Sequence, residues 1–418
     1  MSTQLLNGVR VVEMTEVWAG PMGSSLLGDL GADVVRLESF PRPPALSRPL
    51  REGNAAPGDG PPYERAGSHH LANRNKRNIA VNIRTEDGAE LMRRLAGSVD
   101  VLIEGYSAGT IDGLGFGWSV LREINPNLVM ISMPGWGVEG PYKGYATLGS
   151  GLEATLGHTL VRGYPDGPPG HVPTMYHTDA TGAVGLVTAV IAGLLRREAT
   201  GEGCFIDLSQ AEAWSWQLAG LQAEWTMNQR LPERLGNVDP HVVPHGCYRA
   251  AGGEAGDESW VVVAAENDSQ WGGVARALGH PEWAESGHPW ASITGRLRAR
   301  DDIDAALAAY VGERLAEDAA TSISEAGGIA APVIHHIGLM TSPQLQARDW
   351  LETVTHQYVG TRQLPGFLWR IEPDAPSWDR VCALVGEHNV EVLGELGYSA
   401  EQVEAMLASG AIGDRYGA

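Results

Sequence analysis

A serine inside a glycine-rich turn is the first residue whose surroundings suggest covalent chemistry. Gly105-Tyr106-Ser107-Ala108-Gly109 has the G-x-S-x-G pattern of a nucleophile elbow and follows the apolar run Val101–Glu104. An elbow needs a helix directly after the serine, because backbone N–H groups there bind the oxyanion. Four glycines stand in residues 108–117, and each costs a helix roughly 1 kcal/mol relative to alanine. The pattern therefore favours a turn at the end of a strand, with a Ser107 hydrolase as the alternative.

Other glycine-rich segments do not form a nucleotide-binding loop. Gly113-x-Gly115-x-Gly117 lacks the third glycine of the dinucleotide fingerprint at its required offset and follows no expected strand. Gly149-x-Gly151 has the same defect, and the sequence contains no P-loop. These absences argue against a Rossmann oxidoreductase and against a P-loop nucleotidase.

Histidine and cysteine spacing predicts no metal site. His69-His70 and His335-His336 are adjacent pairs, whose side chains diverge in a strand and share no helix face. Neither an H-E-x-x-H nor a C-x-x-C motif occurs. We therefore expect these histidines to be core or surface residues.

A single acid, Asp179, stands where an apolar helix is expected to begin. Unsatisfied N–H groups and the helix dipole favour a carboxylate at that place, so a simple N-cap is the structural alternative. Two features favour chemistry: the acid would be ionised at neutral pH, as a carboxylate nucleophile must be, and its neighbours are small enough to admit a substrate. The small neighbours are Ala180, Thr181, Gly182, Ala183 and Gly185.

The elements that must position these residues alternate between strand-like and helical patterns in the first half of the chain. Strands are expected at Val9–Met14, Asp33–Glu38, Ile79–Ile83, Val101–Glu104, Leu128–Met133 and Phe205–Leu208. Helices are expected at Gly23–Leu30, Glu86–Ala96, Ala180–Glu198 and Gln210–Asn228. Strands separated by helices predict an α/β fold: a Rossmann-like large domain with a mostly parallel sheet.

The second half indicates a smaller inserted α+β domain. Its expected elements are strands at Gly246–Arg249 and Trp260–Ala264 and helices at Gln270–Leu278, Asp302–Glu313 and Asp318–Glu325. We predict a large domain over 1–228, a linker over 229–243, a small domain over 244–330, and a return to the large domain over 331–418. Trp214, Trp216 and Trp225, on the helix before the linker, are expected in the core. The Pro- and Gly-rich segment Phe40–Pro62 is long enough to be a functional or mobile loop.

Composition limits the partners and the compartment. The formal charge of −21 argues against nucleic-acid binding, because phosphate binding needs clustered cations. Three widely spaced cysteines, Cys204, Cys247 and Cys382, predict reduced thiols and no disulfide framework. The longest apolar run, Ala183–Leu195, is too short to span a bilayer, and the N-terminus has no secretory pattern. We expect a cytoplasmic protein without a membrane partner.

Eight segments that run nearly from end to end of the sequence stand in a specific order and spacing. They are LLNGVRVVEMTEVWAGPMGSSLLGDLGADVVRLES, NRNKRNIAVNIRTEDG, DVLIEGYSAGTIDGLGFGW, NPNLVMISMPGWGVEGPY, GYPDGPP, TDATGAVGLVTAVIAGLLRREATGEG, PHGCYRAAGG and LVGEHNVEVLGEL. By these segments the sequence resembles the class III CoA-transferases, which include formyl-CoA transferase and the carnitine and bile-acid CoA-transferases.

The resemblance implies a mechanism that uses Asp179 as nucleophile. The carboxylate would attack a donor acyl-CoA, giving a mixed anhydride and CoA thiolate, and the thiolate would return to form an aspartyl-CoA thioester. An acceptor carboxylic acid would then take the CoA through a second anhydride. No permanently bound cofactor and no metal is implied, with coenzyme A entering as substrate. The enzyme must position the groups, stabilise oxyanions and exclude water.

The resemblance also implies contacts with CoA, by position. These residues are Val17, Trp18, Val81, Asn82, Ile83, Arg84, Gly105, Tyr106 and Ser107, with Lys143 standing near a lysine of relatives. Trp18 is expected to shape the acyl pocket, which Trp136 and Tyr145 could also line. Ser39 and Gly113 stand where relatives carry arginines, so we expect the CoA phosphates to bind other arginines, with Arg74, Arg77 and Arg84 nearest in sequence.

Two further expectations follow from the resemblance. Racemases of the same fold use a His-Asp pair in the stretch that aligns with Tyr145, where this sequence has no histidine. A racemase using His158 or His177 with an acid remains the alternative function. The family fold implies an interlocked homodimer, and some relatives work as unlike pairs.

Overall fold

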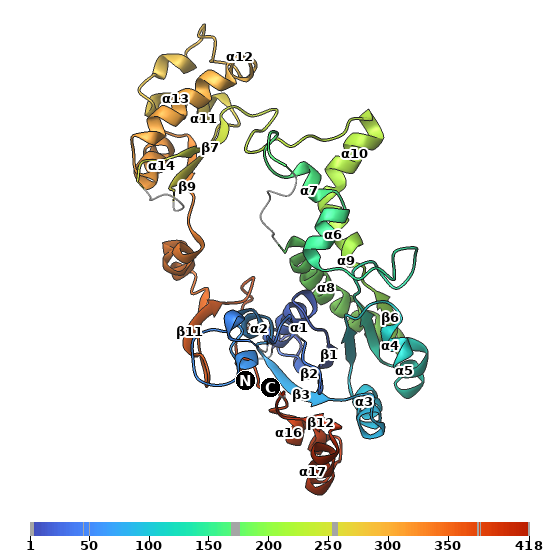
Figure 1. Ribbon diagram of the computed structural model, residues 1–418. Coiled ribbons are helices and arrows are strands. Elements are labelled where there is room, and N and C mark those ends of the chain that lie inside the picture. The colour runs from blue at the N-terminus through green and yellow to red at the C-terminus, as the bar shows by residue number, and fades with distance from the viewer. Residues whose placement is uncertain are drawn as a thin grey trace. The chain divides into compact units, whose positions relative to one another are not determined.

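The computed structural model describes residues 4–44, 46–49, 51–168, 176–252, 258–373, 376 and 378–416. Its internal contacts divide the chain into two compact units. The first unit comprises Met1–His158, Pro173–Arg230 and Gln344–Ala418, and the second comprises Thr159–Val172 and Leu231–Pro343. Figure 1 labels their elements.

A seven-stranded sheet organises the first unit, in the order β12-β3-β2-β1-β4-β5-β6. The strands are β1 (Arg10–Met14), β2 (Asp33–Ser39), β3 (Lys76–Val81), β4 (Val101–Glu104), β5 (Val129–Ser132), β6 (Cys204–Asp207) and β12 (Ile412–Gly413). All neighbours pair in parallel except β12, which runs antiparallel to β3 at the edge. The prediction of a mostly parallel α/β sheet is confirmed.

Helices cover both faces of this sheet. The helices of the first unit are α1 (Ala19–Asp29), α2 (Gly67–Ala72), α3 (Glu86–Ser98), α4 (Thr110–Gly113), α5 (Trp118–Ile124), α6 (Gly149–Thr155), α8 (His177–Thr200), α9 (Gln210–Ser215), α10 (Ala219–Asn228), α16 (Asn389–Glu395) and α17 (Ala400–Ser409). Helix α7 (His158–Val161) starts at His158 of the first unit, and its other residues belong to the second. Short 3-10 turns occupy Glu52–Asn54, Pro62–Glu64 and Trp216–Leu218, and α15 (Pro343–Ala347) precedes a separate hairpin of β10 (Leu351–His356) and β11 (Gly360–Pro365).

The core of the first unit has two layers because alternate strand residues point to opposite faces. Val12 and Leu102 lie in one cluster with Leu91 of α3, and their neighbours Val11 and Ile103 lie in the other. Helices α1 and α8, which pack along one another, lie on the second of these faces (Figure 1). The first turn of α8 is thereby held close to the loop that leads from β1 into α1.

An antiparallel sheet of order β7-β8-β9 forms the centre of the second unit. Its strands are β7 (His245–Arg249), β8 (Trp260–Ala264) and β9 (Ile329–Pro332), and its helices are α11 (Asp268–Ala277), α12 (Ile293–Arg298), α13 (Arg300–Gly312) and α14 (Ala316–Glu325). Trp271 is fully buried among them. Further 3-10 turns lie at Pro281–Ala284 and His336–Thr341.

Contacts within the second unit explain why it contains two segments that are distant in the sequence. The Gly236 amide donates to the Gly163 carbonyl oxygen at 3.0 Å, and Asn237 bonds the Tyr164 hydroxyl at 2.9 Å. Residues before α8 therefore group with the segment that we expected to be a linker. Pairing of β9 with β8 carries the small sheet to Pro332. The domain boundaries expected from composition stay a prediction.

The predicted burial of all three tryptophans before the linker is wrong. Trp214 is buried, but Trp216 is 81% exposed and Trp225 is 46% exposed. The expected single helix over Gln210–Asn228 is divided into α9, a 3-10 turn and α10. This break rotates the later residues away from the core-facing stripe of α9.

Helix α8 is long and apolar enough, by length and composition alone, to cross a membrane. Its buried residues include Leu186, Val187 and Val190, which belong to the core cluster on the α1 face of the sheet. A core helix of a soluble protein has these same properties.

The three cysteines are free thiols, as the sequence predicts.

Candidate active site

The predicted site residues gather at the carboxyl ends of the parallel strands. Strand order reverses between β1 and β4, because β2 and β3 lie on one side of β1 and β5 on the other side of β4. Loops that leave adjacent strands in opposite directions open a crevice at such a point, where ligands bind in open α/β sheets. Val17 and Trp18 follow β1, and Gly105 to Ser107 follow β4.

Asp179 lies in the first turn of α8, with only 7% of its surface exposed. Helix α8 begins at His177 with Tyr176 at the N-cap position, and the Tyr176 side chain makes no capping hydrogen bond. The structural alternative of an N-cap aspartate is therefore wrong. Gly149 lies so close that a Cβ atom built on it would stand 1.9 Å from the Asp179 Oδ2, so the absence of a side chain at position 149 gives the carboxylate its space.

The electrostatic surroundings of Asp179 keep its pKa high for an aspartate. Burial is the main cause and the charge of Glu153 adds to it, while backbone N–H groups of Ala19 and of Asp179 itself oppose them; the pKa rises to about 6. In the part of the chain that the structure describes, no lysine or arginine forms an ion pair with this carboxylate. The side chain is still largely ionised at pH 7, as a nucleophile requires.

A cavity of about 260 Å³ opens onto this carboxylate, and we call it the Asp179 cavity. Seven of the eleven predicted catalytic and contact residues line it: Val17, Trp18, Gly105, Tyr106, Ser107, Lys143 and Asp179. Trp136 and Tyr145 line it as well, as expected for the acyl pocket. Glu16, Gly149 and Gln210 are further lining residues that the sequence reasoning did not single out.

A second cavity, of about 590 Å³, shares Glu16 and Tyr106 with the first, and we call it the Arg84 cavity. The remaining predicted contacts, Val81, Asn82, Ile83 and Arg84, line it. The two cavities thus adjoin along the same edge of the sheet. All the predicted contact residues lie in one or the other.

Of the three arginines that we expected nearest to the CoA phosphates, only Arg84 lies at a cavity wall. Arg74 is buried against Asp29 at 2.6 Å, and Arg77 pairs with Asp33 at 2.5 Å and with Glu395 at 2.6 Å. These two guanidinium groups are occupied within the fold. Arg84 remains at the cavity wall, together with Arg42 from the Pro-rich loop. Arg42 was missed because its sequence neighbourhood looks like an ordinary loop.

Ser107 lies in a turn and not at the start of a regular helix. The Thr110 amide donates to the Ser107 carbonyl oxygen at 3.0 Å, Gly109 takes a positive φ of 80°, and the four-residue α4 begins only at Thr110. Among the described residues, Ser107 makes no hydrogen bond to a histidine. This geometry fits the turn interpretation and gives the hydrolase alternative no base.

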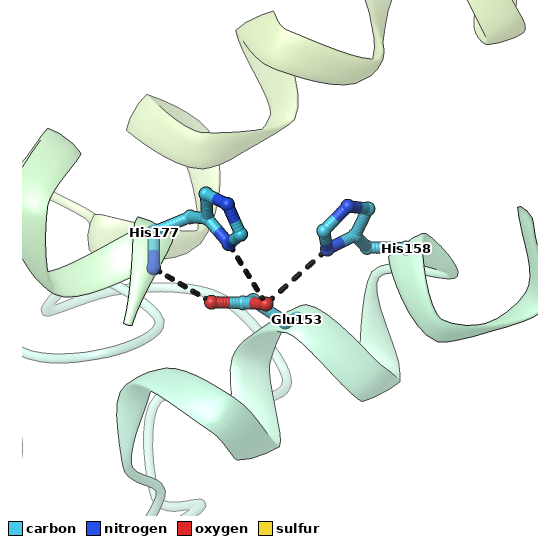
Figure 2. Close-up of side chains that lie close together, drawn as sticks. All are labelled: Glu153, His158 and His177. Carbon is cyan, nitrogen blue, oxygen red and sulfur yellow. Dashed lines mark hydrogen bonds and ion pairs between the residues drawn. The ribbon is translucent and has the colours of Figure 1, made fainter. Parts of the chain in front are cut away.

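Glu153, His158 and His177 come together beside the Asp179 turn, and the sequence analysis did not predict this cluster. Both imidazole rings direct Nδ1 toward the Glu153 Oε2, at 3.2 Å from His158 and 3.4 Å from His177 (Figure 2). The His177 amide also donates to the other Glu153 oxygen, at 2.8 Å (Figure 2). The two histidines considered for a racemase therefore face a common glutamate.

Comparison with known proteins gives this geometry a family. The model of CoA-transferase family III matches residues 6–389. Succinyl-CoA–D-citramalate CoA-transferase of Chloroflexus aurantiacus is 29% identical over 402 residues, which cover 96% of each chain. Human succinyl-CoA:glutarate CoA-transferase is 28% identical over 97% of this chain and 90% of its own. Formyl-CoA:oxalate CoA-transferase of Streptomyces coelicolor is 28% identical over 99% of this chain and 100% of its own.

Solved structures agree on the fold. A CAIB/BAIF family protein from Brucella suis superimposes with a TM-score of 0.82 at 28% identity, covering 95% of this chain and 100% of that one. Rv3272 from Mycobacterium tuberculosis, at 23% identity and a TM-score of 0.78, shares the fold over 94% of this chain and 99% of its own. These relatives do not favour the racemase alternative. The chain belongs to CoA-transferase family III and is a class III CoA-transferase.

Proposed function

We propose that the protein moves CoA from an acyl-CoA thioester to a free carboxylic acid, with Asp179 as the covalent carrier. The observation that carries the proposal is the largely buried carboxylate of Asp179. It forms no ion pair with a described cation, and it lines a cavity at the point where the strand order reverses. Burial without a cationic partner is a costly arrangement for a carboxylate, and such arrangements gather at functional sites.

The reaction proceeds by acyl exchange at this carboxylate. An Asp179 oxygen attacks the thioester carbon, forming a mixed anhydride and releasing CoA thiolate. The thiolate attacks the Asp179 carbonyl carbon, which releases the donor acid and leaves an aspartyl-CoA thioester. The acceptor carboxylate attacks that thioester, giving a second anhydride and thiolate, and the thiolate then takes the acceptor acyl group and frees Asp179.

The surroundings of Asp179 support each requirement of these reaction steps. The gap left by Gly149 gives the carboxylate room to become an anhydride or a thioester. The adjoining Arg84 cavity provides Arg42 and Arg84 for the phosphates of CoA, while Tyr106 lies between the two cavities. Trp18, Trp136 and Tyr145 form an aromatic wall that can exclude water from the anhydride.

The relatives suggest where a search for substrates should begin. Their names specify succinyl-CoA or formyl-CoA as donor and citramalate, glutarate or oxalate as acceptor. We propose a short carboxylic acid as the acceptor, with the aromatic wall and Lys143 selecting among candidates. A matrix of succinyl-, acetyl- and formyl-CoA against these acids and against aromatic acids, measured by the mass of the new thioester, identifies the pair.

Trapping of the enzyme-bound intermediate tests the mechanism directly. Incubation with donor acyl-CoA and then hydroxylamine should convert Asp179 to a hydroxamate, which adds 15 Da to its peptide in mass spectrometry because –OH is replaced by –NHOH. The label should depend on the donor. Turnover with labelling of another residue, or with none, would refute the aspartyl carrier.

We also propose that the protein is a homodimer, interlocked as the family resemblance implies. Exposed apolar side chains on α8 and on the 3-10 turn after α9 support a partner: Val184 is 47% exposed, Leu195 is 61% exposed and Trp216 is 81% exposed. Large exposed apolar faces usually mark interaction sites. Light scattering on the eluting peak of a gel-filtration column should give twice the chain mass of 44.5 kDa, and a monomer would contradict the proposal.

A further inference from the structure

The Glu153 cluster is built from three separate elements. Glu153 projects from α6, His158 begins α7 and His177 begins α8. One ligand atom of each residue lies within 4.8 Å of those of the other two. Figure 2 shows the two rings on either side of the glutamate, both with a nitrogen directed at its carboxylate. This convergence is unusual for residues that serve only to cap or pack a helix.

The spacing matches that of ligands around a transition metal ion. Nitrogen and oxygen ligands that lie about 2.0–2.1 Å from a tetrahedral zinc ion are about 3.4 Å from one another. The Glu153 Oε2 lies 3.2 Å from the His158 Nδ1 and 3.4 Å from the His177 Nδ1. The two histidine Nδ1 atoms lie within 4.8 Å of each other, so a cation that replaced the shared hydrogen bonds would leave the two oxygen–nitrogen spacings as they are and draw the two rings toward a common centre.

The chemistry of the three ligands selects a class of cation. Two imidazoles and one carboxylate suit zinc and the neighbouring divalent transition metals, whereas magnesium and calcium prefer oxygen ligands. With neutral histidines the set carries one negative charge, which a divalent cation more than compensates. Among the described residues the cluster supplies three ligands.

The surroundings hold the ligands and leave an entry path. The side chain of Glu153 is 5% exposed and that of His158 is 15% exposed, while that of His177 is 39% exposed and gives access from solvent. The indole of Trp214 packs on both rings, with centroids 5.1 Å from His158 and 5.3 Å from His177. Packing of this kind fixes ring orientation, as a preorganised site needs.

We propose that Glu153, His158 and His177 bind one divalent transition cation, of which Zn²⁺ is the probe of choice. The cation would join α6 and α7 to the first turn of α8, which carries Asp179. It takes no part in acyl exchange and acts as a clamp on the segment that presents the nucleophile. Since the site is defined by its own ligands, it stands whether or not Asp179 is the carrier.

Metal titration of the purified full chain tests the proposal without any variant. The protein is first treated with EDTA and dialysed, and is then titrated with Co²⁺ and with Zn²⁺. We expect one equivalent of Co²⁺ to give visible absorption bands of a low-symmetry site, Zn²⁺ to displace them, and calorimetry to give a Zn²⁺ dissociation constant in the micromolar range or below. An absence of stoichiometric binding would overturn the proposal.

Variants then locate the ion. Glu153→Gln keeps an oxygen that can accept the His177 amide hydrogen but removes the carboxylate charge, and it should weaken Zn²⁺ binding by at least tenfold. His158→Gln should do the same from a different element. The matched control is His280→Gln, because His280 forms an exposed pair with Glu282 at 2.9 Å and lies in the second unit. Equal affinity in wild type and both site variants, or equal loss in the control, would refute the assignment.

A thermal measurement covers the case in which a site variant folds poorly. A cation that binds only the folded state raises the melting temperature as its concentration rises. Wild type and His280→Gln should show this rise with Zn²⁺ and not with Mg²⁺. A melting curve of wild type that is unchanged by Zn²⁺ would count against the site regardless of the variants.

Discussion

Two groups of buried charges in the first unit follow opposite rules. On strands β1 and β2, Glu13 pairs with Arg36 at 3.0 Å, and Glu38 pairs with Arg48 at 2.6 Å. All four side chains are at most 2% exposed. At the crevice, Asp179 is nearly as buried but has no cationic partner among the described residues. The first group joins strands and loops, and the second faces a cavity.

The pKa directions express the same difference. Burial raises the pKa of Glu13, but Arg36 and Lys76 outweigh it and leave the pKa below its ordinary value. Burial also raises the pKa of Asp179, where the charge of Glu153 increases it further, to about 6. Neighbouring cations compensate the charge of Glu13, whereas the described residues around Asp179 include no compensating cation, as is common at functional sites.

The largest effect should come from removing the unpaired carboxylate. Asp179→Asn keeps the shape of the side chain but takes away the nucleophile, so transfer should fall on the order of 10⁴-fold or more. Steady-state rates of product thioester formation measure this, with circular dichroism as a check on folding. Asp207→Asn, a surface change at the end of β6 that lines neither cavity, is the control and should stay near wild type. Comparable activity in the two variants would show that transfer does not need the Asp179 carboxylate.

Breaking a paired charge should damage stability and not chemistry. Glu13→Gln leaves Arg36 and Lys76 buried with less compensation, so the free energy of unfolding should drop by about 3–5 kcal/mol. Glu90→Gln makes the same change in an exposed pair with Arg94, and should cost under about 1 kcal/mol. Denaturant unfolding measures both. Equal losses would show that burial does not distinguish these pairs.

Acid should weaken the fold through His70, which lies near the paired charges. Burial lowers the pKa of His70 to about 4, and its Nε2 bonds the Glu64 carbonyl oxygen at 2.8 Å. The unfolded chain takes up this proton below about pH 6.5, but the folded one resists until about pH 4. Stability is therefore complete above pH 6.5 and is lost as the pH falls toward 4.

Replacement of His70 isolates this contribution. His70→Gln retains a donor for the Glu64 carbonyl but cannot titrate, so its loss of stability between pH 7 and pH 5 should be smaller than that of wild type by about 1–2 kcal/mol. Denaturant midpoints at the two pH values measure the difference. An unchanged pH dependence would assign the acid sensitivity to other groups.

The smallest effect concerns an arginine in the wall of the Arg84 cavity. Arg84→Gln removes a cation from the cavity wall, so the KM for acyl-CoA should rise about tenfold with little change in kcat, since phosphate contacts contribute roughly 1–2 kcal/mol of uniform binding. Arg93→Gln on α3, which lines neither cavity, should leave KM unchanged. A lower kcat at constant KM in Arg84→Gln would indicate a role other than binding CoA.

Local patterns predicted the sheet better than the helices around the site. The expected bounds of β4 and β8 agree with the structure, because continuous or alternating apolar residues between polar turns define a strand. Helix α8 starts three residues before its expected start, at His177, since no strong capping residue marks the beginning. That difference decides whether Asp179 is a cap or a side chain within the first turn.

Contacts between distant residues could not be predicted from spacing. Arg77 looked available for phosphate, but its partner Glu395 lies 318 residues away. Glu153 and His177 lie close together because α6 packs against α8. Since this packing is a tertiary contact, the spacing of the two residues in the sequence matches no metal-binding motif. Asp179 could be singled out as a candidate, since a lone acid among small residues is visible locally, and its role stays a prediction.

The strand β12 has a consequence for the order in which the protein is assembled. It pairs Ile412 with Val81, and nearby the Tyr416 hydroxyl donates to the Ser39 carbonyl oxygen at 2.9 Å. Val81 and Ser39 both line the Arg84 cavity. A chain emerging from the ribosome therefore cannot finish this wall until residues near 412–416 have been released, so the wall of the Arg84 cavity is completed only after strands β1 to β6 have all been synthesised.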